Sequence, residues 1–168
     1  AVDFWILDAK FDKVLETRLL IARIMMIMRQ YEEAMELLQH ALAKLQKKLG
    51  GRNQMCVRTL VMLGDCAEKM HNYYVATYHY EQALSWALKV YGTVHEEVAK
   101  ITHYTGLMYI KTRKIKLARD SLEIAARISM KLKGSRHRDT IIAQCDLAQA
   151  HINNAEYEPA NKALVHAE

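Results

Sequence analysis

The stretch that decides the fold lies at residues 31–50 and reads YEEAMELLQHALAKLQKKLG. A shift of 42 residues along the chain gives YYVATYHYEQALSWALKVYG, and a second shift of the same length gives IKLARDSLEIAARISMKLKG. No insertion interrupts the recurrence. A fixed period in this range is typical of arrays of stacked structural repeats, in which each repeat contacts only its neighbours.

The repeat is carried by columns of residues that share a size. Small residues recur in two columns of the stretch and in one column upstream of it: Ala34, Ala76, Ala118 and Ala160; Ala41, Ala83, Ala125 and Ala167; Ala22, Gly64, Gly106 and Ala148. Large residues recur between them: Tyr31, Tyr73, Ile115 and Tyr157; Leu38, Tyr80, Leu122 and Leu164. Two helices approach closely only where one presents a small side chain and the other fills the space with a large one. The columns therefore predict helix pairs.

Composition favours the same class. The chain has 168 residues, 51% of them hydrophobic, with one Pro and six Gly, which leaves little material for long loops or an all-β fold. Apolar spacing predicts first helices over 12–29, 54–70, 96–112 and 139–154 and second helices over 31–48, 73–90, 115–132 and 157–168. The glycines 50, 92 and 134 are expected to end second helices in a left-handed cap.

The prediction is an all-α solenoid of antiparallel helix pairs with about four repeats. Residues 1–168 form a single domain, with repeats over approximately 11–50, 53–92, 95–134 and 137–168, the last one truncated. The chain is expected to be a fragment of a longer array, in which residues 1–7 are the tail of a preceding second helix.

These columns carry a family resemblance. Gly106 and Tyr109, followed by Ala118, Leu122 and Ala125, resemble the tetratricopeptide repeat. The 42-residue period and the turns at 92–95 and 134–137, which read Gly-x-x-His, resemble the repeats of kinesin light chains. The turns are also similar to those of the C-terminal domain of SET-and-MYND lysine methyltransferases. The resemblance implies a non-catalytic scaffold or adaptor that binds a peptide or helix in a concave groove lined by the first helices.

Catalytic, metal and cofactor sites are not predicted. His95 and Glu96 begin an HExxH-like motif, but Ala99 stands at the second histidine position. The three cysteines form no CxxC pair, which favours a reducing, intracellular and cytoplasmic setting. Cys66 and Cys145 are expected in the core. The longest apolar run, residues 19–28, is too short to span a bilayer, so no membrane insertion is expected.

The predicted groove has an apolar N-terminal half and a cationic C-terminal half. The expected partner-binding residues are Leu19, Met26 and Val61 in the first half and Lys100, His103, Lys111 and Lys114 in the second. A matching partner is a protein or peptide with apolar and acidic residues, or a neighbouring domain of the same polypeptide.

Residues 111–138 contain ten Lys or Arg against Asp120 and Glu123. This basic stretch is either a solvated outer face or a binding surface, and Arg127, Lys131 and Lys133 are expected on the outer helices. RNA binding through the third repeat is the alternative function, disfavoured because the stretch has no aromatic residues on which bases could stack. A structural lobe of a multidomain enzyme is a further alternative.

Overall fold

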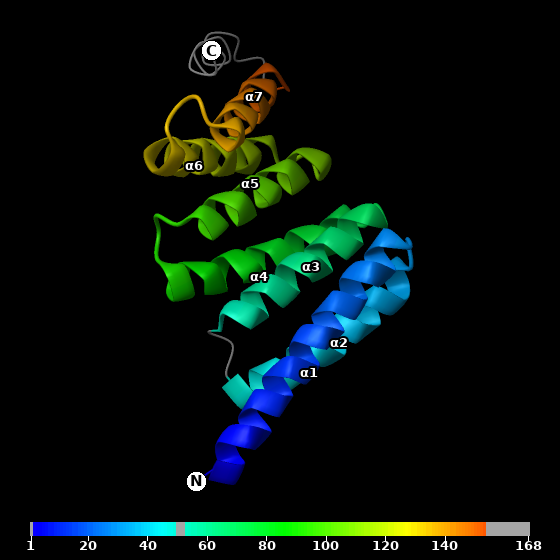
Figure 1. The fold of residues 1–168 in the computed structure, drawn as a ribbon. Coiled ribbons are helices and arrows are strands. Elements are labelled where there is room, and N and C mark those ends of the chain that lie inside the picture. The colour runs from blue at the N-terminus through cyan, green and yellow to red at the C-terminus, as the bar shows by residue number, and fades with distance from the viewer. Residues whose placement is uncertain (1, 50–52, 154–168) are drawn as a thin grey trace.

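A computed structural model describes the backbone of residues 2–49 and 53–153 and the side chains of residues 13–48 and 53–152. This part of the chain forms seven α-helices and no strand, which confirms the predicted all-α class (Figure 1). The helices are α1 Val2–Ile27, α2 Tyr31–Leu49, α3 Gln54–Lys69, α4 Tyr73–Tyr91, α5 Glu96–Lys111, α6 Ile115–Lys133 and α7 Arg138–Asn153. None of them combines the length and apolarity needed to cross a membrane.

The helices stack one after another from α1 and α2 at one end of the molecule to α6 and α7 at the other (Figure 1). Each helix packs against the next one in the chain, and α1 also touches α3 as α5 touches α7. α1 therefore lies next to α3, and α5 lies next to α7. This arrangement confirms the predicted solenoid of helix pairs.

The small residues stand where the two helices of a pair meet. A Cβ on Gly64 of α3 would lie 2.6 Å from Cε1 of Tyr80 in α4, and a Cβ on Gly106 of α5 would lie 2.8 Å from Cγ of Leu122 in α6. Ala118 is fully buried in the same contact, and its carbonyl oxygen would lie 3.4 Å from that Cβ of Gly106. A side chain at Gly64 would clash with the Tyr80 ring, and one at Gly106 would require the Leu122 side chain to move.

The turns inside the repeats share one backbone motif. Arg29, His71 and Arg113 each have a positive φ, of 62°, 58° and 60°. The amide of each of these residues donates to the carbonyl three residues back, and the next amide donates to the carbonyl five residues back. This is a Schellman motif, which usually has glycine at the left-handed position. Here three bulky residues stand there instead, so a glycine was not available as a sequence signal.

The second helices α4 and α6 end at the predicted glycines, whose backbone conformation differs from that of the turns inside the repeats. Gly92 has φ 81° and ψ −177°, and Gly134 has φ 82° and ψ 171°. A positive φ with an extended ψ is a region open essentially to glycine alone, and it is not the left-handed helical cap that the sequence predicts. Gly50 lies outside the described residues.

A side chain at the same repeat position caps the N-terminus of each of the first helices α3, α5 and α7. The Asn53 side chain accepts a hydrogen bond from the amide of Met55 at 2.7 Å, and Nδ1 of His95 accepts from the amide of Glu97 at 3.1 Å. Nδ1 of His137 accepts from the amide of Asp139 at 3.2 Å. The histidine of the Gly-x-x-His turn is therefore an N-cap, which satisfies an amide that the helix leaves without a partner.

Six of the helices agree with the sequence-based expectation to within one residue at each end, and α1 does not. It runs without a break from Val2, so residues 2–7 belong to the first helix of the first repeat and not to a preceding second helix. Cys66 is buried as expected, whereas Cys145 is exposed. The predicted helix over 157–168 lies outside the described residues.

Candidate functional site

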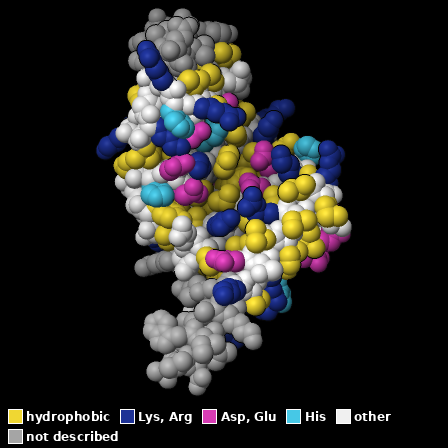
Figure 2. Space-filling view, in the orientation of Figure 1, with side chains coloured by type: hydrophobic (Ala, Val, Ile, Leu, Met, Phe, Trp, Pro, Cys, Tyr) yellow, Lys and Arg dark blue, Asp and Glu magenta, His cyan; other side chains and the backbone are white. Residues whose placement is uncertain are grey.

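Two pockets open on the same face of the array, because equivalent repeat positions line both of them. Val61 and Met62 of α3 line one pocket, and the residues one period later, His103 and Tyr104 of α5, line the other. Figure 2 shows hydrophobic side chains that gather in a hollow of the visible face, bordered by charged side chains of both signs.

The first pocket, which we call the α1–α3 pocket, has a volume of about 530 Å³. Its apolar wall comes from Met26 and Ile27 at the end of α1 and from Val61 and Met62 of α3, with Tyr31 at the start of α2. The remaining residues that line it are charged: Arg23, Arg58, Asp65 and Lys69. The pocket is therefore an apolar hollow with a charged rim.

The charge of the α1–α3 pocket is positive. Arg23, Arg58 and Lys69 are exposed, and no ion pair is found for them among the described residues. Asp65 accepts a hydrogen bond from the buried Tyr80 hydroxyl at 2.6 Å. Desolvation raises the pKa of Asp65 above its usual value, and burial together with the nearby Asp65 raises the pKa of Tyr80. The three positive charges of the pocket therefore stand around one carboxylate, that of Asp65, which already accepts a hydrogen bond from Tyr80.

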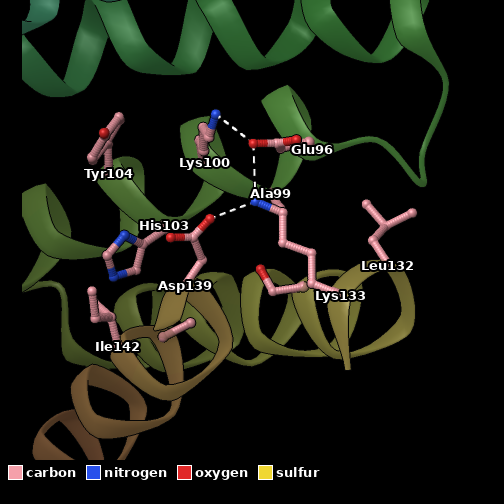
Figure 3. Close-up of a pocket in the computed structure, with 11 residues that line it drawn as sticks. Glu96, Ala99, Lys100, His103, Tyr104, Leu132, Lys133, Asp139 and Ile142 are labelled. Atoms are coloured by element: carbon pink, nitrogen blue, oxygen red, sulfur yellow. Dashed lines mark hydrogen bonds and ion pairs between the residues drawn. The ribbon is translucent and has the colours of Figure 1, made fainter. Parts of the chain in front are cut away.

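The second pocket, the α5–α7 pocket, has a volume of about 230 Å³. Figure 3 shows its side chains, which come from α5, from the end of α6 and from α7. Ala99, Leu132, Ile142 and Ala143 supply apolar surface. Most of its charged groups already pair with one another.

The ion pairs of the α5–α7 pocket form a chain. Lys100 Nζ lies 2.7 Å from Glu96 Oε1, and Lys133 Nζ lies 2.9 Å from the same oxygen and 2.5 Å from Asp139 Oδ2 (Figure 3). Hydrogen bonds from Lys100 and Lys133 lower the pKa of Glu96 to about 2, and the hydrogen bond from Lys133 lowers the pKa of Asp139. His103 Nε2 lies 2.7 Å from Asp146 Oδ2. A ligand carboxylate would have to compete with these internal partners.

Tyr104 joins the two pockets. It lines the α5–α7 pocket, and its ring centroid lies 5.7 Å from that of Tyr80, whose hydroxyl binds Asp65 of the α1–α3 pocket. Desolvation raises the pKa of Tyr104, and the nearby Asp65 raises it further, while Lys100 lowers it. The two pockets are therefore linked through the buried ring of Tyr80.

The two pockets contain four of the seven residues expected in the groove. Met26 and Val61 line the α1–α3 pocket, and Lys100 and His103 line the α5–α7 pocket. Leu19 is only 3% exposed and packs in the core with Leu60 and Met62, so its predicted place on the groove surface is wrong. Lys111 and Lys114 line neither pocket.

Three cations of the groove were not predicted from the sequence: Arg23, Arg58 and Lys69. The signal for Arg58 was present, because it occupies the same repeat column as Lys100. The predicted polarity of the groove is also corrected. Unpaired positive charge lies at the N-terminal pocket beside the apolar surface, and the C-terminal lysine Lys100 is neutralised by Glu96 and Glu97.

The basic residues of the stretch 111–138 lie in several different environments. Lys133 turns into the α5–α7 pocket and does not face outward as expected. Arg127 pairs with Glu123 at 2.7 Å and Arg119 pairs with Asp120 at 3.1 Å on α6. Lys111 lies 6.0 Å from the ring centroid of Tyr73, and Lys114 lies 5.7 Å from that of Tyr109. Aromatic rings absent from the stretch itself therefore stand beside two of its lysines.

The chain is similar to known proteins in sequence and in fold. Residues 13–85 match the tetratricopeptide repeat family model. No curated protein sequence matches the chain. A solved structure from Podosopora anserina, named for a kinesin light chain with nearly identical TPR-like repeats, is similar with a TM-score of 0.82 and 22% identity, over 91% of this chain and 72% of that one.

Two further solved structures are also similar in fold. BtubC (BKLC) from P. vanneervenii has a TM-score of 0.85 and 16% identity over 94% of this chain and 63% of that chain. A Rap protein complexed with competence and sporulation factor has a TM-score of 0.74 and 16% identity over 94% of this chain and 42% of that chain. These likenesses concern the fold.

The family match lies on α1 to α4, and the Gly64–Tyr80 contact inside it recurs in α5 and α6 as Gly106–Leu122. Residues 13–85 therefore match the tetratricopeptide repeat, and the helical pairs of the described residues form a solenoid similar in fold to kinesin light chain TPR-like repeats.

Proposed function

We propose that the chain is a non-catalytic scaffold or adaptor segment that binds a peptide or helix of another protein in the groove formed by the α1–α3 and α5–α7 pockets. The observation that carries this proposal is the shared repeat register of the two pockets, which places them on one face. A groove with successive apolar hollows suits a chain segment whose side chains project at regular intervals.

The α1–α3 pocket supplies the chemistry of recognition. A large apolar side chain of the ligand fits against Met26, Ile27 and Val61, and its burial provides affinity. Arg23, Arg58 and Lys69 around that surface attract carboxylates of the ligand and speed association. The favoured ligand therefore carries an apolar anchor next to Asp or Glu. Its binding weakens as salt concentration rises, because the rim charges are exposed.

The solved Rap protein complex supports the idea that a fold of this type accommodates another molecule. Lys100 and His103 contribute to the same groove in this proposal, and Lys111 and Lys114 stay outside its centre. The partner class extends to a neighbouring domain of the same polypeptide. The proposed setting is the cytoplasm.

The test is selection from a random peptide display library on the full chain. We expect enriched peptides with a large apolar residue beside Asp or Glu, and binding that is lost in a variant with Arg23→Glu, Arg58→Glu and Lys69→Glu. The matched control carries the same change of charge outside both pockets, as Lys111→Glu, Lys114→Glu and Lys116→Glu, and should keep peptide binding.

RNA binding through the basic third repeat is the second candidate, and one observation favours it. Tyr73 and Tyr109 lie beside Lys111 and Lys114, which gives the basic surface two rings on which bases could stack. The same two charge-reversal variants discriminate. Loss of binding to a single-stranded oligonucleotide only in the Lys111, Lys114 and Lys116 variant, without any enriched peptide, would replace the groove proposal by this one.

A further inference from the structure

The two pockets differ in the sign of the charge around them. Three cations and one carboxylate line the α1–α3 pocket: Arg23, Arg58, Lys69 and Asp65. Two cations and two carboxylates line the α5–α7 pocket: Lys100, Lys133, Glu96 and Asp139. When histidine is neutral, the wall of the first pocket therefore carries two positive charges in excess, whereas the charges on the wall of the second pocket balance.

Two further carboxylates contact residues on the wall of the α5–α7 pocket. Oε1 of Glu97 lies 3.3 Å from Nζ of Lys100, and Oδ2 of Asp146 lies 2.7 Å from Nε2 of His103. With neutral histidines, four carboxylates stand against two lysines, which leaves an excess of two negative charges. Among the described residues, no arginine forms an ion pair with any of the four. The surroundings of this pocket therefore favour a cation.

The α5–α7 pocket also offers apolar and aromatic surface. Leu132, Ile142 and Ala143 supply the apolar part of its wall. Tyr104 lines the same pocket and is 36% exposed, so a ligand can reach its ring (Figure 3). A pocket that combines carboxylates, an aliphatic wall and an aromatic ring suits a side chain with an apolar stem and a planar cationic head.

We propose that the α5–α7 pocket binds an arginine of the ligand peptide, a proposal that rests on the peptide-binding function given above. The stem of this arginine packs on Leu132 and Ile142, and its guanidinium lies against the ring of Tyr104. The apolar and acidic residues of the same peptide occupy the α1–α3 pocket.

The carboxylates on the wall have acceptor capacity for this guanidinium. The ion pairs with Lys100 and Lys133 use Oε1 of Glu96, and the pair with Lys133 uses Oδ2 of Asp139. Each carboxylate has a second oxygen, and a guanidinium can reach it with a planar fork of donors without displacing Lys133. An ammonium group has no planar face to lie against a ring, so the pocket favours arginine over lysine.

The opposite charges of the two pockets also fix the direction in which the peptide lies along the array. A peptide bound the other way round would place its arginine among the cations of the α1–α3 pocket and its carboxylates among those of the α5–α7 pocket. Like charges would then meet at both pockets, which disfavours this orientation. The acidic residue and the arginine should therefore occur in one constant order in the sequences of binding peptides.

The first experiment uses two small probes on the full chain, so it does not depend on a selected peptide. The cation n-butylguanidinium has the stem and head of arginine, and hexanoate has an apolar stem with a carboxylate. We expect n-butylguanidinium to shift the amide NMR signals of Ala99, Ile142 and Ala143 at the α5–α7 pocket. Hexanoate should instead shift those of Val61 and Met62 at the α1–α3 pocket.

A variant with Glu97→Gln and Asp146→Asn removes the two excess negative charges. The amide side chains keep the size and an acceptor oxygen of the carboxylates, so circular dichroism should show an unchanged helix content. The dissociation constant of n-butylguanidinium should rise by at least about threefold, whereas that of hexanoate should not rise. The matched control carries Asp120→Asn and Glu123→Gln at exposed positions of α6 outside both pockets, and it should leave both dissociation constants unchanged.

Three results of these titrations would overturn the proposal. They are binding of n-butylguanidinium at the α1–α3 pocket, no shift of the α5–α7 amides by this probe, and an equal loss of its binding in the control variant.

The second experiment uses peptides selected by display on the full chain. Replacement of their arginine by norleucine, which keeps an apolar stem without the charge, should weaken binding to the native chain by about tenfold. The same replacement should have a smaller effect on the variant with Glu97→Gln and Asp146→Asn, because the guanidinium has then lost part of its attraction.

The two proposals can fail separately. Selected peptides that lack arginine but lose binding when the cations of the α1–α3 pocket are reversed would overturn the arginine site and support the groove. Binding of n-butylguanidinium at the α5–α7 pocket without any selected peptide would support the site and count against the peptide groove.

Discussion

The ring of Tyr80 occupies the space that a side chain at Gly64 would need, since a Cβ there would lie 2.6 Å from Cε1 of the ring. Tyr80 cannot move away easily, because it is fully buried and its hydroxyl donates to Asp65 at 2.6 Å. At the equivalent place one repeat later, Gly106 faces Leu122, whose branched side chain has other rotamers. Gly64 therefore faces a side chain that is held in place, whereas Gly106 faces a side chain that can adopt another rotamer.

Gly64→Ala should destabilise the fold by about 1–3 kcal/mol, because overpacking against Tyr80 outweighs the helix propensity that alanine adds. Gly106→Ala should cost less or stabilise, since Ala22 occupies the same column opposite Leu38 and is fully buried. Urea denaturation of the two variants checks this difference. Equal changes in the free energy of unfolding would contradict the role assigned to the tyrosine ring.

Asp65 gives a pH-dependent prediction. Desolvation raises the pKa of its folded-state carboxyl above 3.8, so the folded state favours the protonated form. The native chain therefore loses stability as pH rises from 3.8 through the folded-state pKa. Asn at position 65 still accepts the hydrogen bond of Tyr80 and carries no charge, so Asp65→Asn should stabilise at neutral pH.

The stabilisation by Asp65→Asn should vanish at a pH below 3.8, where both side chains are neutral. Urea unfolding at several pH values measures the difference between the two proteins. The control is Asp120→Asn on the exposed surface of α6, which should show no stabilisation at neutral pH. A stabilisation by Asp65→Asn that stayed constant down to acid pH would show that charge burial is not its cause.

Most of the fold could be predicted from the sequence, because the helix contacts depend on residue size and recur at a fixed period. Gly106 and Ala118 mark a contact that any helical hairpin of this spacing must make. The continuation of α1 to Val2 was missed because the expectation rested on aligning seven residues with a later second helix. The turn motif at Arg113 was missed because its usual glycine is absent.

The groove could be predicted only in part, since a repeat column fixes the face of a helix but not its exposure. Leu19 shares a column with Val61 and His103, yet it is buried in the core cluster that also contains Leu60 and Met62. The neutral character of the α5–α7 pocket depends on contacts between distant residues. Lys133 reaches Glu96 across 37 positions, and no local pattern in the basic stretch indicates this partner.

Arg113 offers a gain in stability. Its φ of 60° is unfavourable for a residue with a Cβ, and glycine adopts it without that cost. Arg113→Gly should therefore raise the free energy of unfolding by up to ~1 kcal/mol, whereas Arg113→Ala, which keeps a Cβ, should not. Thermal unfolding followed by circular dichroism compares the two. A larger gain from alanine than from glycine would show that the arginine side chain, and not its backbone conformation, limits stability.

The N-cap at His95 can be separated from its ring contact. Nδ1 of His95 accepts from the amide of Glu97, and the ring stacks on Tyr91 with centroids 4.4 Å apart and an angle of 14°. His95→Ala removes both interactions. His95→Asn removes the stack and should keep the cap, because Asn53 forms it at the same place in the preceding repeat.

The free energy of unfolding, measured in urea, should therefore be about 1 kcal/mol higher for His95→Asn than for His95→Ala, because this is the usual contribution of an N-cap. Any deficit of His95→Asn relative to the native chain then reports the loss of the stack on Tyr91. His137 provides the comparison, because its Nδ1 caps α7 through the amide of Asp139 at 3.2 Å. At that position asparagine should again exceed alanine by a similar amount. If alanine and asparagine proved equal at both sites, the histidine of the Gly-x-x-His turn would not stabilise the fold as an N-cap.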